Sequence, residues 1–195
     1  MIAMLVSIMS VVAILALYKN LVGVSVNATS DAQHDGHIAT AILTAQLELQ
    51  TAGYGIENAG SEHLNANAAG TELRWRYLDG GTYQCRALRE TAVSDNVRRL
   101  ALFEATANCT ADSALSGLQW QELTVLANIE RVEAMPDQIF TFSVSTAKCS
   151  PYGIGEKEKH LIANIRTMSA ADFNDTGNAI AAATYPICIA STHPS

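Results

Sequence analysis

Four cysteines are the residues of this 195-residue chain with the best-defined chemistry: Cys85, Cys109, Cys149 and Cys188. None lies in a C-x-x-C pair, and no histidine stands at zinc-finger spacing from them, so we expect no metal site. An even count behind an apolar start indicates disulfides formed in an oxidising compartment. Of the three pairings we favour Cys85–Cys109 and Cys149–Cys188, because pairs that are neighbours in sequence close the shorter loops. The sequence alone leaves the connectivity open.

The other patterns that resemble metal or catalytic sites are weak. His34 and His37 are three residues apart beside Asp35, but no third ligand is evident, so we interpret them as a solvated helix surface. The acidic segment 172–175 lacks the spacing and the terminal Glu of an EF-hand loop, which favours a turn. The sequence also contains no nucleophile elbow, zincin motif or paired catalytic carboxylate. We therefore expect neither an enzyme nor a cofactor-binding protein.

Three N-x-S/T sequons begin at Asn27, Asn108 and Asn174, where chance would give roughly one. Sequons of this kind mark surface loops in secreted proteins, so we treat all three as candidate glycosylation sites.

The charge of the chain argues against nucleic acid as a partner. Its formal net charge is −7, whereas phosphate binding needs a basic surface. The arginines occur in close pairs, which we interpret as solvated faces of strands. These pairs are Arg74/Arg76, Arg86/Arg89 and Arg98/Arg99.

The segment from Met1 to Leu17 contains no charged residue and only two hydroxyls, Ser7 and Ser10. As a helix it would be roughly 25 Å long, close to the ~30 Å hydrocarbon core of a bilayer. Tyr18 and Lys19 then supply an interfacial aromatic ring and a cation. The segment therefore predicts a membrane-associated helix.

Three interpretations of this apolar segment compete. A cleavable secretory signal normally starts with Lys or Arg, and an ordinary signal anchor usually carries charge on both sides. This sequence starts directly with the apolar run. We favour the third interpretation, a chain whose short basic leader has been removed, so that Met1 is the mature N-terminus.

A second helical pattern follows the apolar segment. Gly23 and the β-branched residues around it weaken helix propensity, so a break over 22–29 and a continuous helix are equally expected. Ser30 to Gln33 has the form of a capping box, and Gly53 is the expected C-cap. Between them one helix face is apolar. That face consists of Ile38, Ala41, Ile42, Ala45 and Leu49, widened by Leu43 and Leu47.

The remainder of the chain has the pattern of a β-rich head. Alternating polar and apolar residues predict strands, and Asp79-Gly80-Gly81 predicts a hairpin turn. We expect strands over 71–78, 82–88, 96–104, 120–133, 138–146, 160–168 and 185–190, and loops over 54–70 and 169–184. The predicted fold class is α+β, a long N-terminal α-helix packed on an antiparallel β-sheet. Its parts are an apolar helix (1–29), an amphipathic helix (30–53) and a disulfide-braced head (54–195).

This order of elements resembles the type IV pilin, or prepilin-type N-terminal methylation, family, and its PilW-like members in particular. The resemblance rests on the segment from Gln46 to Gly55. Its Ala-Gly-Tyr-Gly end matches the phrase that closes the amphipathic helix of PilW-like minor pilins, about 50 residues after the apolar start. Leu5 departs from the family, which usually has at this position a Glu that pairs with the terminal amine of a neighbouring subunit.

The resemblance implies a structural subunit of a type IV pilus or pilus-like filament, with Met1 processed and methylated. On physical grounds we expect Gly53 to turn the chain off the helix, so that Tyr54 can pack beneath the head. Implied partners are copies of itself or other pilins, the lipid bilayer before assembly, the inner-membrane assembly machinery and the prepilin peptidase. The implied location is the inner membrane, then the extracellular surface. A type II secretion pseudopilin and a non-polymerising membrane-anchored periplasmic binding module are the alternatives. The expected assembly surface consists of Met1, Ile2, Met4, Leu5, Ile8, Val11, Val12, Ile14 and Leu15.

Overall fold

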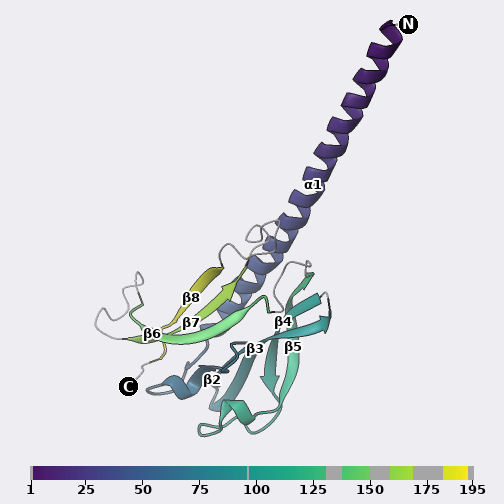
Figure 1. Cartoon of the computed structure of the whole chain (residues 1–195). Coiled ribbons are helices and arrows are strands. Elements are labelled where there is room, and N and C mark those ends of the chain that lie inside the picture. The colour runs from purple at the N-terminus through teal and green to yellow at the C-terminus, as the bar shows by residue number, and fades with distance from the viewer. Residues whose placement is uncertain (1, 96, 131–137, 150–158, 169–181, 193–195) are drawn as a thin grey trace.

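A long helix joined to a β-rich head makes up the computed structural model of this protein (Figure 1). The structure describes the chain except residues 1, 96, 131–137, 150–158, 169–181 and 193–195, and it does not describe the side chains of residues 2–6 and 27. The strands form two antiparallel sheets. The predicted α+β class, with an N-terminal helix on antiparallel strands, is therefore confirmed, with two sheets in place of one.

Helix α1 (Ile2–Leu49) runs without a break and would be about 72 Å long at the usual rise per residue. The alternative with a break over 22–29 is therefore wrong, and the capping box that starts at Ser30 lies inside the helix. A single glycine costs a helix only about 1 kcal/mol, so intact turns on both sides carry the helix through Gly23. The expected C-cap at Gly53 is also wrong, because the helix ends at Leu49, four residues earlier.

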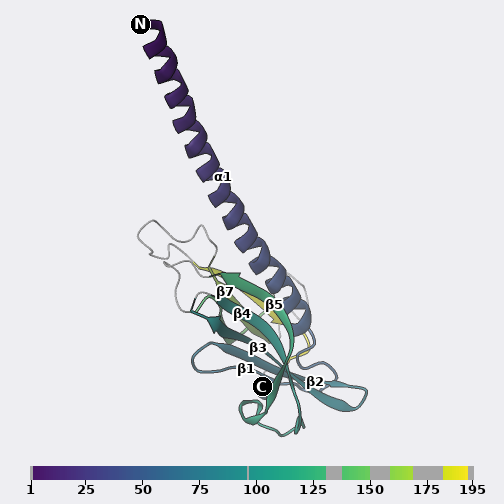
Figure 2. The same ribbon diagram turned by 90° about the vertical axis from the view of Figure 1, so that its right-hand side faces the viewer.

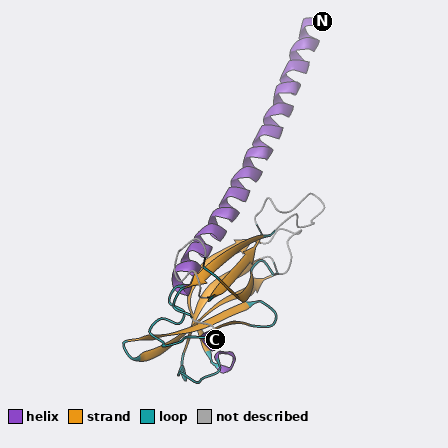
Figure 3. Ribbon diagram, turned by 90° about the vertical axis from the view of Figure 1, so that its left-hand side faces the viewer, coloured by secondary structure: helices purple, strands orange, loops and turns teal. Residues whose placement is uncertain are grey.

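The C-terminal half of α1 lies against the strands, whereas its N-terminal half projects away from the head (Figures 2 and 3). The predicted face from Ile38 to Leu49 is buried in the core. Leu43 and Leu47, however, are 63 % and 73 % exposed, so the prediction that they widen this face is wrong. Each residue turns the helix by about 100°, which places Leu47 roughly opposite the buried Leu49.

The larger sheet is a meander in the order β1-β2-β3-β4-β5. Its strands are β1 (Leu64–Ala66), β2 (Glu72–Asp79), β3 (Thr82–Ser94), β4 (Val97–Ala105) and β5 (Trp120–Glu130). Asp79 pairs with Thr82 across a two-residue loop, and Gly80 and Gly81 both have positive φ, which confirms the predicted hairpin. Strand β1 lies in a predicted loop, because three residues are too few to show an alternating pattern. Short 3₁₀ turns precede β1 (Ser61–His63) and β5 (Leu115–Gly117).

The smaller sheet has the order β6-β7-β8, with β6 (Thr141–Ala147), β7 (His160–Thr167) and β8 (Ala183–Ile189). Both sheets and α1 contribute to one hydrophobic core, which includes Trp75 of β2, Phe142 of β6 and Leu49 of the helix. The head is thus held together by burial of one face of each element against the others.

Two disulfides connect the strands to their loops. Cys85 of β3 is bonded to Cys109, which lies between β4 and β5, and Cys149, after β6, is bonded to Cys188 of β8. These are the two pairs that the sequence analysis favoured.

Candidate functional site: the exposed apolar helix

The N-terminal half of α1 carries large apolar side chains that are exposed and lie outside the hydrophobic core of the head. In the expected assembly surface, Ile8, Val11, Val12, Ile14 and Leu15 are all more than half exposed. Ile2, Met4 and Leu5 belong to the helix, but their side chains are outside the described part, as is Met1. The exposed surface continues along the helix through Met9, Leu17, Tyr18, Leu21, Val24 and Val26.

Such a surface is unstable in water. Burying one Val, Leu or Ile side chain contributes roughly 2 kcal/mol, and ten of the described ones are exposed here around the whole circumference of one helix. Between Ser7 and Val26 the only charged side chain is that of Lys19. Helix α1 is long and apolar enough to cross a bilayer, a property that membrane anchors and signal sequences share. A lipid bilayer or another apolar protein surface would remove this area from water.

The segment after α1 connects the helix to the larger sheet through its backbone. The Gly53 N–H donates to the Arg76 carbonyl at 2.8 Å, and the Leu78 N–H donates to the Tyr54 carbonyl at 2.8 Å. Both Gly53 and Gly55 have positive φ. A Cβ atom on Gly55 would lie 2.5 Å from the Leu78 carbonyl oxygen, so this position needs glycine for close approach as well as for its backbone angle. The Ala-Gly-Tyr-Gly segment thus fixes where the helix joins β2.

The side chain of Tyr54 is 63 % exposed. The expectation that it packs beneath the head is therefore wrong. The backbone carbonyl of Tyr54 accepts from the Leu78 N–H, so the main chain lies against β2 while the ring remains in contact with solvent.

Arg76 corrects the interpretation of the arginine pairs as solvated strand faces. Arg76 as a whole is only 2 % exposed. Its guanidinium donates to the carbonyl oxygens of Thr110, Ala111 and Ser113. Arg76 lies opposite Cys85 across β2 and β3, so the Cys85–Cys109 disulfide and the guanidinium hold the same loop between β4 and β5. Sequence reasoning missed this residue because the loop carbonyls that bind it are more than 30 positions away.

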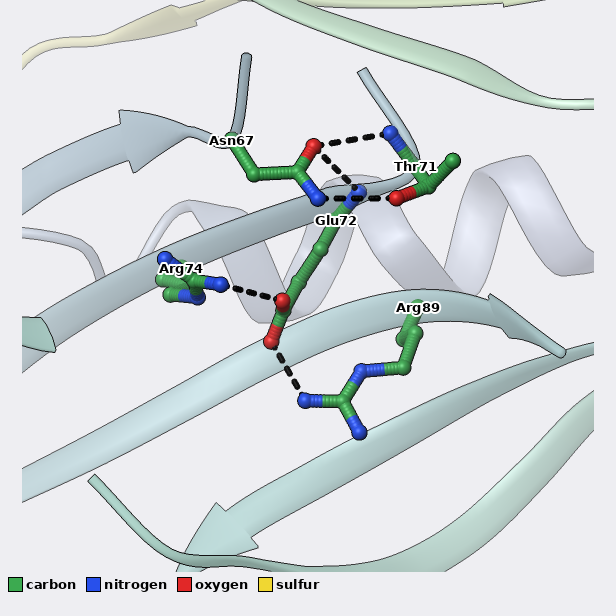
Figure 4. Close-up of polar contacts among 5 residues, drawn as sticks. All are labelled: Asn67, Thr71, Glu72, Arg74 and Arg89. Atoms are coloured by element: carbon green, nitrogen blue, oxygen red, sulfur yellow. Dashed lines mark hydrogen bonds and ion pairs between the residues drawn. The ribbon is translucent and has the colours of Figure 1, made fainter. Parts of the chain in front are cut away.

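Glu72 lies at the centre of a second buried polar cluster (Figure 4). It is 5 % exposed, and its carboxylate accepts hydrogen bonds from Arg74 and, at 2.7 Å, from Arg89. Asn67 closes the turn before it, accepting from the Thr71 N–H at 2.8 Å and the Glu72 N–H at 3.2 Å. Burial opposes ionisation of Glu72, but the hydrogen bonds and charges of the two arginines outweigh it and hold its pKa below the usual value.

Glu90 connects the two sheets. Its carboxylate, on β3, accepts from the Ile139 N–H at 3.0 and 3.1 Å and from the Phe140 N–H at 2.6 Å, just before β6. Burial raises the pKa of this carboxyl, although the two N–H groups and the charge of Arg98 act in the opposite direction. Nothing in the sequence pattern around Glu90 distinguishes it from an exposed strand residue, so this contact is visible only in the structure.

The remaining candidate residues in the described part of the chain are not brought together into a site. Asn108 is exposed in a loop, Asn27 lies within α1, and Asn174 is outside the described residues, as is the acidic segment 172–175. Within the part of the chain that the structure describes, no three His, Cys, Asp or Glu residues are placed to hold a metal ion.

No family model, no curated protein and no solved structure matches this chain.

Proposed function

We propose that this protein is a pilin-like structural subunit, anchored in a membrane by α1 and then assembled into an extracellular filament through the same helix. One observation carries the proposal: a single continuous helix has an apolar half that is exposed on all sides and a second half that is built into the core of the head. A plain membrane anchor needs only a membrane-spanning segment. It does not need that segment to continue as one helix into the core of the head.

Two features of the helix support assembly over anchoring alone. Leu43 and Leu47, about one helical turn apart, form a short exposed apolar stripe beyond the part of the helix that a bilayer would cover. Transfer of the apolar half from lipid to a bundle of like helices exchanges one apolar environment for another, so it costs little free energy.

A charge placed on that stripe separates filament assembly from membrane anchoring. We expect Leu47→Glu to reduce filaments in sheared cell-surface material, seen by electron microscopy, at least tenfold. The protein should remain in the membrane fraction, because Leu47 lies beyond the span. Leu123→Glu is the matched control: Leu123 is also exposed, on β5, so the same charge on the head should leave filaments unchanged.

Two outcomes of this experiment would count against filament assembly through α1. Absence of filaments from the unmodified protein would contradict the proposal and favour a non-polymerising membrane-anchored module. Equal filament yield from Leu47→Glu and the unmodified protein would show that the stripe is not an assembly contact.

A further inference from the structure

Lys19 is the first charged residue of the sequence, and it lies on the exposed apolar half of α1. At a membrane surface its ammonium group reaches water and lipid phosphates. In a filament built through α1, the same group is surrounded by the apolar side chains of neighbouring helices. A charge in such surroundings is costly unless an opposite charge meets it. Assembly through this helix therefore favours an acidic partner for Lys19.

The chain's own helix does not supply that partner. The acidic residue of α1 nearest to Lys19 in the sequence is Asp31, 12 positions further on. At the usual helix geometry the two residues are about 18 Å apart along the axis and about 120° apart around it, far beyond the ~4 Å of an ion pair. Among the described residues, Lys19 forms no ion pair. A partner for it has to come from a second copy.

Three acidic residues of α1 could face a neighbouring helix: Asp31, Asp35 and Glu48. Glu48 already forms an ion pair with Arg86 at 3.4 Å. Asp35 is partly buried, whereas Asp31 is exposed and lies closest to the apolar half. That half projects away from the head, so helices of adjacent copies approach one another there before their heads do (Figure 1). Charge and exposure together favour Asp31.

We propose that Lys19 of one copy pairs with Asp31 of a neighbouring parallel copy, and that this ion pair sets the axial offset between adjacent subunits at about 18 Å. The copies are parallel because both enter the membrane in the same orientation. Without an offset, Lys19 would lie level with the same cation of its neighbour. This inference rests on the proposed filament function and specifies its register.

The angular positions of the two residues fit a filament. Lys19 and Asp31 lie on different sides of one helix, about 120° apart, so the same copy presents its cation to one neighbour and its carboxylate to another. Such a contact is heterologous and repeats from copy to copy. Complementary charges of this kind fix register between helices that apolar packing alone leaves free to slide.

A charge swap tests the pair, with filaments in sheared cell-surface material counted by electron microscopy. Lys19→Asp and Asp31→Lys should each lower the yield at least tenfold, because each places like charges together. The double variant should recover to within threefold of the unmodified protein, because it restores opposite charges at the same offset. The matched control combines Lys19→Asp with Asp79→Lys, an exposed position on the head. It has the same net charge as the double variant and should not recover.

A helical reconstruction of the unmodified filament measures the offset directly and needs no variant. We expect adjacent helices displaced by about 18 Å, with Lys19 beside Asp31. A displacement of about 24 Å would place Asp35 there instead and would overturn the assigned partner. Membrane fractionation and a thermal melt in detergent check that the variants insert and fold.

The remaining outcomes separate this pair from the filament itself. Absence of filaments from the unmodified protein would contradict both. If the unmodified protein forms filaments but the swapped double variant does not recover, the pair is wrong and the filament function stands. Equal recovery with Asp79→Lys would also overturn the pair, because net charge would then explain the effect.

Discussion

Arg74, Arg76 and Arg89 have similar neighbours in the sequence but different surroundings in the head. Arg74 and Arg89 share the carboxylate of Glu72, whereas Arg76 binds loop carbonyls and has no carboxylate partner among its hydrogen bonds. Burying an arginine costs free energy unless its donors find acceptors, and Glu72 and the loop carbonyls supply most of those acceptors. At the residue scale, the head is therefore stabilised by a few buried polar contacts that connect distant segments.

Replacing Glu72 by Gln should destabilise the head by about 2 kcal/mol at pH 7, because two charge-assisted hydrogen bonds are lost. The folded pKa of Glu72 lies below its usual 4.5, so its contribution is present above pH 4.5 and is lost as pH falls through the folded value. The unfolding free energy, measured with a chemical denaturant, should therefore differ less between pH 7 and pH 3 for Glu72→Gln than for the unmodified protein. The control is Glu122→Gln in the exposed pair with Arg99, which should cost less than about 1 kcal/mol.

Glu90 should show the opposite pH dependence. Its folded pKa is raised, so the stability linked to its proton is present below 4.5 and is lost as pH rises through the folded value. Glutamine cannot ionise but keeps a carbonyl oxygen for the Ile139 and Phe140 N–H groups. The unfolding free energy of Glu90→Gln, relative to the unmodified protein, should therefore increase between pH 4 and pH 8. A relative decrease over this range would contradict the assigned burial of the charge.

At the element scale, the position of α1 on the head depends on the short segment that joins it to β2. Gly55 and Gly80 both have positive φ, but a Cβ on Gly55 would lie 2.5 Å from a carbonyl oxygen, whereas nothing lies within 4 Å of one on Gly80. We expect Gly80→Ala to cost about 1 kcal/mol for the backbone angle alone and Gly55→Ala about 3 kcal/mol or more. Thermal or chemical unfolding measures both, and equal costs would show that the close approach to β2 does not matter.

The loop between β4 and β5 illustrates how two contacts stabilise one element. The Cys85–Cys109 disulfide spans 24 positions, so its removal should cost about 3 kcal/mol by chain entropy. Arg76 holds the same loop, so the costs of Arg76→Met and of Cys85→Ala/Cys109→Ala should differ from additivity by at least about 0.5 kcal/mol in a double-mutant cycle. Strict additivity would mean that the two contacts act on separate parts of the loop.

At the scale of the whole molecule, the apolar half of α1 and the head are independent in their packing. The buried part of the helix starts at Ile38, and every side chain from residue 7 to residue 26 is exposed. A chain that begins at Ser30 should therefore be soluble and monomeric by gel filtration, and should melt within about 5 °C of the full chain in detergent. Ser30 and Gln33 would then act as a capping box at the new helix start. A large loss of melting temperature would indicate that the apolar half stabilises the head.

Local patterns account for what the sequence predicted correctly. The apolar helix, the Asp-Gly-Gly hairpin and most strands depend on side-chain periodicity or turn chemistry within about ten residues, which any short window contains. The favoured disulfide pairs agree with the structure because each joins two cysteines that follow one another in the sequence, although their separations are 24 and 39 positions.

The tertiary structure alone decided which local preferences prevailed and which residues met. Cooperative turns on both sides carried α1 through Gly23, the angular position of Leu43 and Leu47 around the helix left them exposed, and distant carbonyls turned Arg76 into a buried contact. The strands divide into two sheets, which meet where the Phe142 N–H donates to the Gly70 carbonyl 72 positions away. Such contacts have no signature in a short window, because burial and pairing are set by segments that come together only when the whole chain folds.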